Sequence, residues 1–278
     1  MKGRIPHHAV ATLAGVALIL GAYSGAAHAD ILFASTATNN SVADFGILNT
    51  ATGVYTPLGN NGVTLSGLGT LNGLLYGAAY NTSSGTLFTV NTANGSLTVV
   101  GNSNVAYLDF AVAAGGLWAV GTDDNLYSIK TSTGAATLVG PTNLAASTAN
   151  FNSLASGLGF LFYDLMDGLF TLNPNTGASS FVGCGGALVF QVCSGPQMSA
   201  MAASSGIVYG VDSVVEHLHT INTSTGQATF TVTVTGNGNF ISGLSVAPAS
   251  LSAVPEPGSL SLLGVGAAFL LATRRRMR

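Results

Sequence analysis

A fifteen-residue pattern recurs five times between residues 45 and 232, and it constrains the fold more than any other feature of the chain. In each copy a short alternating strand runs into a turn rich in Asn and Thr, and a second strand leaves it. A glycine in the turn supplies the positive φ that such a hairpin needs, and the Asn and Thr side chains can bond back onto its backbone. The copies are residues 45–59, 87–101, 126–140, 169–183 and 218–232, with turn glycines Gly53, Gly95, Gly134, Gly177 and Gly226.

Each hairpin is preceded by two further strand-like pieces. In the second repeat these are residues 65–69 and 74–79. Successive turn glycines are 42, 39, 43 and 49 residues apart. Four short strands in about 40 to 45 residues is the unit size of a β-propeller blade. The pattern therefore predicts an all-β chain built from propeller blades.

The two ends of the repeat region predict how the ring closes. The first repeat begins at residues 31–35, which match a second strand, so it lacks a first strand. Residues 240–247 form a strand-like piece that resembles residues 65–68 and has no hairpin after it. If this strand completes the first blade, the sheet edges are protected. We therefore expect five four-stranded blades closed by residues 240–247, with a β-sandwich or a solenoid as the alternative.

The N-terminus has the three parts of a secretory signal peptide. Lys2 and Arg4 precede an apolar run from residue 9 to residue 27, and the small-residue site Ala27-His28-Ala29 follows. Such a segment is removed by signal peptidase. We expect cleavage between Ala29 and Asp30, and an uncleaved membrane helix is the alternative.

The C-terminus has a different three-part arrangement. Val254, Pro255, Glu256 and Pro257 are followed by an apolar run over residues 258–272 and by a basic cluster of Arg274, Arg275, Arg276 and Arg278. A run of 15 residues is short of the roughly 20 that cross a bilayer comfortably, and the arginines should stay cytoplasmic. The chain thus divides into a signal peptide (1–29), a repeat domain (30–250) and a tail (251–278) that contacts the membrane before processing.

This tail resembles the PEP-CTERM sorting signal. The resemblance implies a Gram-negative bacterium that makes exopolysaccharide, and an exosortase that recognises the tail and cleaves it near Pro255–Pro257. On this interpretation the motif is recognised in a substrate and is not a catalytic site. The protein would be anchored transiently in the inner membrane and then sorted to the cell surface or extracellular matrix; an anchor that is never cut is the alternative. The hairpins resemble propeller repeats of secreted bacterial proteins, which supports the fold and not an activity.

The charge of the body excludes one class of partner. Residues 30–253 contain a single base, Lys130, and nine acids, for a net charge of −8. Nucleic-acid binding depends on Lys and Arg to displace counterions from phosphates. The body is therefore not expected to bind nucleic acid.

Two pairs of side chains could form a site. Cys184 and Cys193 are the only cysteines, and in an exported chain such a pair predicts a disulfide. His217 and His219 share one face of a strand, with Glu216 on the other. Without an evident third ligand we expect a solvated strand face and no metal site.

The acids give weaker signals. Asp123 and Asp124 lie between two strands and are expected in a turn, as are Asp164 and Asp167. Asp109 is the one acid on an innermost strand, from which a side chain can reach the central channel.

No motif for a nucleophile, a phosphate loop or a zinc site is present in the sequence. We therefore expect no catalytic residues and no cofactor. The predicted function is a non-enzymatic structural or binding module associated with exopolysaccharide, with a glycan or a matrix protein as its partner. The alternative is a polysaccharide hydrolase or lyase that uses acids near the channel.

Overall fold

The structure is a computed structural model, and it describes most of the repeat domain. The described residues are 30–37, 43–80, 84–113, 115–144, 152–157, 160–165, 168–184, 186, 188–189, 192–193 and 195–247. The predicted signal peptide, the sorting motif, the arginine cluster and Asp167 lie outside them. Within the described part of the chain, no helix is long and apolar enough to cross a membrane.

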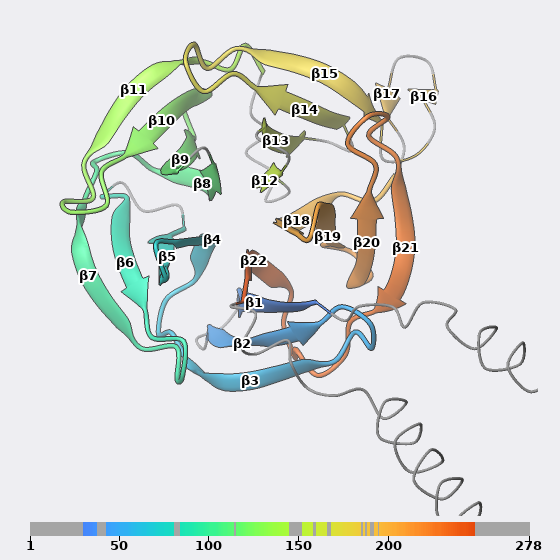
Figure 1. Ribbon diagram of the computed structural model, residues 1–278, viewed down its shortest axis with the longest axis horizontal. Helices are drawn as coiled ribbons and strands as arrows, with labels where there is room; N and C mark the ends of the chain where they lie inside the picture. The colour runs from blue at the N-terminus through green and yellow to red at the C-terminus, as the bar shows by residue number, and fades with distance from the viewer. Residues whose placement is uncertain are drawn as a thin grey trace, which may run out of the picture.

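Five four-stranded antiparallel sheets stand around a central axis as the blades of a β-propeller (Figure 1). The fold and the blade count predicted from the repeats are confirmed, and the sandwich and the solenoid are wrong. From the axis outward, blade 1 contains β22 (Ile241–Val246), β1 (Ile31–Thr36), β2 (Asp44–Asn49) and β3 (Tyr55–Asn60); blade 2 contains β4 (Leu65–Leu71), β5 (Leu74–Ala79), β6 (Thr86–Val90) and β7 (Leu97–Asn102); blade 3 contains β8 (Tyr107–Ala113), β9 (Gly116–Gly121), β10 (Asn125–Ile129) and β11 (Ala136–Pro141); blade 4 contains β12 (Asn152–Gly157), β13 (Phe160–Leu165), β14 (Gly168–Leu172) and β15 (Ser179–Cys184); blade 5 contains β18 (Met198–Ser204), β19 (Ile207–Asp212), β20 (His217–Ile221) and β21 (Ala228–Thr233).

The ring closes at two radii. On the inside β22 pairs antiparallel with β1, with Leu244 opposite Ala34, as predicted for residues 240–247. On the outside the backbone beyond β21 meets the β2–β3 turn: Thr235 donates to Gly53 O at 3.0 Å, and Tyr55 donates to Thr235 O at 2.8 Å. Blade 1 is therefore built from both ends of the body, and it is also bonded to blade 5.

The core is divided among the blade interfaces. One cluster of buried apolar side chains lies between each pair of neighbouring blades, five in all within the described residues. The cluster between blades 5 and 1 contains Leu32 and Leu48 from blade 1, Val211 and Leu218 from blade 5, and Leu244 from the closing strand. Removing one blade would therefore expose two clusters.

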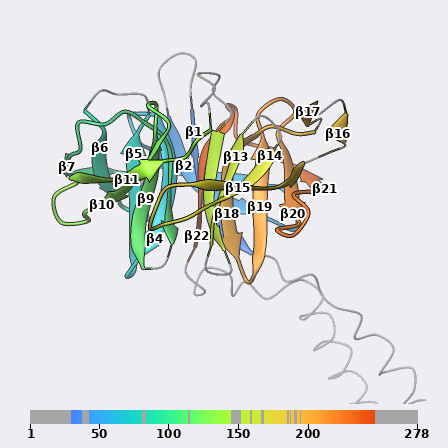
Figure 2. The same cartoon turned by 90° about the horizontal axis from the view of Figure 1, so that it is seen from above.

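Glycines let the outer parts of neighbouring blades approach closely. The five turn glycines have φ between 69° and 79°, as the hairpin pattern predicts. A second glycine near the end of an outer strand packs against the hairpin turn of the next blade. A Cβ on Gly101 would lie 2.0 Å from Thr133 O, and one on Gly140 would lie 2.2 Å from Thr176 O. Because the blades twist, β15 lies nearly crosswise to β13 (Figure 2) and its end reaches blade 5.

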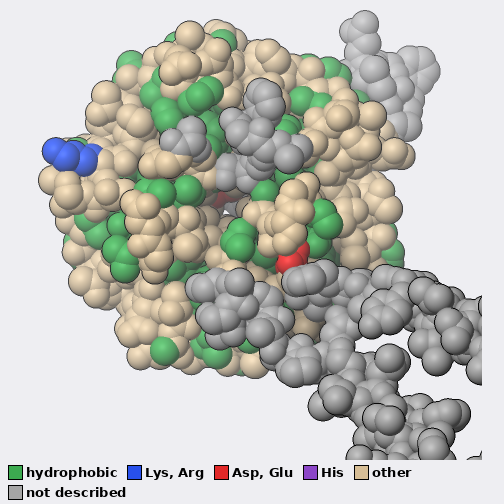
Figure 3. Space-filling view, in the orientation of Figure 1, with side chains coloured by type: hydrophobic (Ala, Val, Ile, Leu, Met, Phe, Trp, Pro, Cys, Tyr) green, Lys and Arg blue, Asp and Glu red, His purple; other side chains and the backbone are tan. Residues whose placement is uncertain are grey.

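The strand directions give the propeller two distinct faces. Ala247 N donates to Ile31 O at 3.1 Å, so the body begins and ends at one place. We call the face where β1 begins and β22 ends the tail face, and the opposite one the far face. The surface seen down the axis is mostly uncharged (Figure 3), in keeping with a chain in which 6% of residues are charged.

Candidate functional site

The central channel is lined mainly by apolar side chains. It contains a cavity of about 100 Å³ between the innermost strands of all five blades. Its few polar groups bond one another: Thr70 Oγ1 lies 3.0 Å from Ser245 Oγ and donates to Val246 O at 2.9 Å. Pockets for drug-sized ligands run from about 300 to 1,000 Å³. The cavity has room for a few waters and not for a chain of sugars.

Asp109 lies on the innermost strand β8, as predicted, but its carboxylate is occupied. The side chain is buried, Oδ1 accepts a hydrogen bond from Phe110 N at 2.6 Å, and Oδ2 accepts one from Leu154 N at 2.6 Å. Burial raises the pKa of Asp109 well above its ordinary value, although these two hydrogen bonds act in the opposite direction. Through its hydrogen bond with Leu154, Asp109 links blade 3 to blade 4.

Asp164 makes a similar connection, and its expected place in a turn is wrong. It lies in β13 and is buried, because this strand continues to Leu165. Its Oδ2 accepts a hydrogen bond from Met198 N of blade 5 at 3.1 Å. Asp123 and Asp124 do lie in a turn, between β9 and β10, where Asp123 Oδ2 accepts from Tyr127 Oη at 2.5 Å.

Replacing Asp109 tests the bond between blades 3 and 4. Asp109→Ala leaves two buried backbone N–H groups unpaired and should lower the free energy of unfolding by about 3 kcal/mol at pH 4, whereas Asp109→Asn keeps one acceptor and should cost about half as much. Because the raised pKa makes folded Asp109 hold a proton that the unfolded chain releases above about pH 4, the contribution of Asp109 to stability should fall as the pH rises. In urea unfolding, the difference in unfolding free energy between the wild type and Asp109→Asn should be smaller at pH 7 than at pH 4. A constant difference between them would show that Asp109 is not the group that titrates.

His219 forms a buried pair with an acid from the preceding strand, so the solvated strand face expected for the two histidines is wrong. His219 Nε2 lies 3.1 Å from Asp212 Oδ2, and both residues are buried. His217 Nδ1 lies 4.0 Å from the same oxygen, and its side chain is about one-third exposed (34%). The β19–β20 turn brings Asp212 back over the face that both histidines share. Phe230 of β21 covers the other side, with its ring centroid 4.7 Å from that of His217.

The turn fixes the orientation of the Asp212 carboxylate. Oδ1 accepts hydrogen bonds from Val214 N at 3.0 Å and Val215 N at 2.8 Å, which leaves Oδ2 for the histidines. Burial alone would raise the pKa of Asp212, but the hydrogen bonds from His219 and from the turn hold it below its ordinary value. Glu216, in the same turn, has its pKa raised to about 7 by burial and accepts from Asn237 Nδ2 at 2.7 Å instead.

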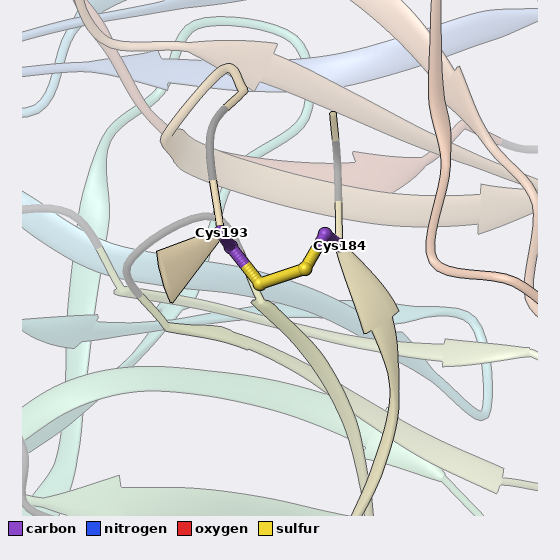
Figure 4. The surroundings of a disulfide bond; sticks show 2 residues. All are labelled: Cys184 and Cys193. Atoms are coloured by element: carbon purple, nitrogen blue, oxygen red, sulfur yellow. A yellow bond between two sulfur atoms is a disulfide. The ribbon is translucent and has the colours of Figure 1, made fainter. Parts of the chain in front are cut away.

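The predicted disulfide between Cys184 and Cys193 is present (Figure 4). Cys184 is the last residue of β15, and Cys193 ends the short hairpin of β16 (Leu188–Val189) and β17 (Val192–Cys193). The bond therefore ties this hairpin to the end of the outermost strand of blade 4. It closes a loop with a sequence separation of nine.

Removing the disulfide should have a local and modest effect. Replacing both cysteines by alanine opens a short loop, which should cost at most about 2–3 kcal/mol of unfolding free energy. Thermal unfolding of the double variant should match that of the wild type under reducing conditions. A loss much larger than this would mean that the hairpin is part of the folding core.

The outer strands carry a repeated exposed dipeptide. At equivalent positions each outer strand has a hydroxyl side chain followed by an apolar one, and all ten residues are exposed. We call these the rim dipeptides: Thr56-Pro57, Thr98-Val99, Thr137-Leu138, Ser180-Phe181 and Thr229-Phe230. In blades 2 to 5 the apolar member is between 53% and 62% exposed. Sequence reasoning missed this feature, although the same step of each repeat encodes it.

Comparison with known proteins supports both the tail and the fold. Residues 253–276 match the model of the PEP-CTERM protein-sorting motif. No curated protein matches the chain. A structural genomics protein of unknown function from Bacteroides thetaiotaomicron VPI-5482 is similar in structure, with 15% identity and a TM-score of 0.51 over 74% of this chain and 58% of that one. A chain of the nidogen/laminin complex gives a TM-score of 0.49 at 10% identity, over 79% of this chain and 98% of that one.

These similarities carry different weight. The chain spans less than two thirds of the Bacteroides protein, and at this identity the likeness concerns the fold alone. The sorting motif is specific, and it implies export, membrane anchoring, processing by an exosortase and sorting to the surface. The chain is thus an exported, surface-sorted protein that carries a five-bladed β-propeller ahead of a PEP-CTERM sorting motif.

Proposed function

We propose that the propeller is a non-enzymatic binding module that holds the protein in the exopolysaccharide of its host, with a neutral glycan bound along the rim dipeptides. The observation that carries this proposal is the recurrence of an exposed hydroxyl beside an exposed apolar side chain on every outer strand. Single exposed apolar residues are ordinary. We infer an interaction surface from the repetition of the pair at the same position of every blade. A polysaccharide also repeats the same groups, namely hydroxyls and apolar C–H faces.

The charge and the positions of the acids support a neutral partner and a role without catalysis. The body has a net charge of −8, so an anionic glycan would be repelled. Glycoside hydrolysis uses two carboxyl groups on either side of the scissile bond. Asp109 and Asp164 instead bond the backbone of neighbouring blades, and Asp212 pairs with His219.

The test is co-sedimentation of the full-length chain, in detergent, with insoluble exopolysaccharide purified from the host. We expect saturable binding that leaves the polymer intact and that falls at least tenfold in the variant with Phe181→Ser and Phe230→Ser. A matched variant with Val214→Ser and Val215→Ser removes exposed apolar side chains away from the rim and should bind normally. Release of reducing ends or unsaturated sugars would reveal a hydrolase or lyase. An absence of binding, or equal loss in both variants, would overturn the proposal.

A further inference from the structure

We propose that Asp212, His217 and His219 form a binding site for a divalent transition-metal ion such as Zn²⁺. One ligand atom from each of the three residues lies within 4.8 Å of the other two. Ligand atoms around a tetrahedral zinc ion lie about 3.3 Å apart, since each bond is about 2.0–2.1 Å long. The separations of Asp212 Oδ2 from His219 Nε2 (3.1 Å) and from His217 Nδ1 (4.0 Å) bracket that value.

The side chains around the site keep these ligands in place. The backbone N–H groups of Val214 and Val215 hold Asp212 Oδ1, so Oδ2 faces the histidines without a rotamer change. Phe230 packs against both imidazole rings. The 4.0 Å between His217 Nδ1 and Asp212 Oδ2 must shorten toward about 3.3 Å for both atoms to bind one ion. The partial exposure of His217 permits this movement. A site held by such contacts binds with little ordering cost.

The ligand set selects the class of ion. Ca²⁺ and Mg²⁺ require oxygen ligands, whereas two imidazoles and a carboxylate suit zinc and its first-row neighbours. Among the described residues the only base is Lys130, in the β10–β11 turn of blade 3, so no basic side chain of that part of the chain lies in this turn to compete for the carboxylate. Three protein ligands leave a fourth position for water, which can enter beside the exposed edge of His217.

His219 sets the strength of the site. In the free protein Nε2 lies 3.1 Å from Asp212 Oδ2. If an ion binds Nε2, the proton of the neutral imidazole must be on Nδ1. That nitrogen is buried and has no hydrogen-bond partner among the described residues. Metal-binding histidines with a second-shell acceptor gain about 10- to 100-fold in affinity from it. The site should therefore be weaker by that factor than one with a complete second shell.

The site lies on the far face of the propeller. β19 runs away from the tail face, and its last residue, Asp212, is opposite Met198 at the start of β18. Ser199, next to Met198, donates to Ile241 O at the start of the closing strand at 2.7 Å. Ile241 and Ala247 are at opposite ends of that strand, about 20 Å apart. A bound ion would therefore be on the side away from the sorting tail.

Zinc titration of the full-length chain in detergent tests the proposal, because His217 is partly exposed and can be changed without opening the core. We expect calorimetry to show one Zn²⁺ bound per chain and no binding of Ca²⁺. His217→Ala and Asp212→Asn should each weaken binding at least tenfold, while the metal-free melting temperature of His217→Ala stays near that of the wild type. The other histidines of the chain are His7, His8 and His28. Replacing all three by glutamine should leave binding unchanged; loss of binding in that control, or no saturable binding below about 1 mM, would overturn the assignment.

Discussion

Gly101→Ala is expected to lower the free energy of unfolding by about 3 kcal/mol, which for a domain of this size corresponds to about 6–12 °C in melting temperature. The added Cβ would lie 2.0 Å from the carbonyl oxygen of Thr133 and 2.8 Å from its carbonyl carbon. Both atoms belong to the backbone of the next blade's hairpin turn, so they cannot move aside as a side chain could. Either the hairpin shifts or blades 2 and 3 separate at the rim. Circular dichroism during thermal unfolding measures the change.

Gly116→Ala is the matched control for this substitution. Gly116 begins strand β9 in blade 3, where an added Cβ would have its nearest contact at 3.4 Å, with Trp118 Nε1. Its backbone does not have a positive φ. We expect a change within about 0.5 kcal/mol, as for other substitutions away from tight contacts. If the two glycine variants have the same melting temperature, the close approach between the outer strand and the hairpin does not hold the blades in place.

Leu244→Ala is expected to cost about 3–4 kcal/mol and to loosen the closure of the ring. Leu244 is buried in the closing strand, and its side chain belongs to the cluster that joins blades 5 and 1. The substitution leaves a cavity at the one place where the ring is held by a strand from the far end of the body. A loosened β22 would also expose the inner edge of β1, and free edges pair with other chains. The variant should therefore associate at high concentration, which light scattering detects.

Leu74→Ala controls for the loss of a leucine as such. Leu74 is 52% exposed at the start of β5, so its removal should change stability by no more than about 0.5 kcal/mol. If the Leu244→Ala protein has the same melting temperature as the Leu74→Ala protein and stays monomeric, closure of the ring does not depend on the packing of β22.

The fold could be predicted because its unit is local. The turn glycines, the alternation of the strands and the spacing of the copies all lie within about 45 residues, and the missing first strand points to residues 240–247. The glycines near the ends of the outer strands can be seen in the sequence, but their contacts with the next blade cannot. Position 101 requires glycine because the Thr133 carbonyl of the next repeat lies against it. No pattern within one copy of the repeat indicates that contact.

The chemistry of the site was less accessible for the same reason. Alternation along a strand placed His217 and His219 on one face, and this is correct. Asp212 lies in the strand before them, and it reaches them through a turn in which Glu216 has a φ of 55°, a conformation that the sequence does not indicate. Burial of His219 likewise depends on Phe230 of the next strand. The sequence predicts a turn at Asp164, whereas its strand continues to Leu165 and its carboxylate accepts a hydrogen bond from blade 5.

The pairing of β1 with β22 also decides when the body can finish folding. Ser35 and Ser242, which meet across this pair, are 207 residues apart in the chain. At a synthesis rate of about 5–20 residues per second, the first strand waits about 10–40 s for its partner, and contacts of such long range form late in any case. The sorting motif begins at residue 253, six residues beyond Ala247. The strand that completes blade 1 therefore emerges only just before the sorting motif, so the ring cannot close until almost the whole body has been exported.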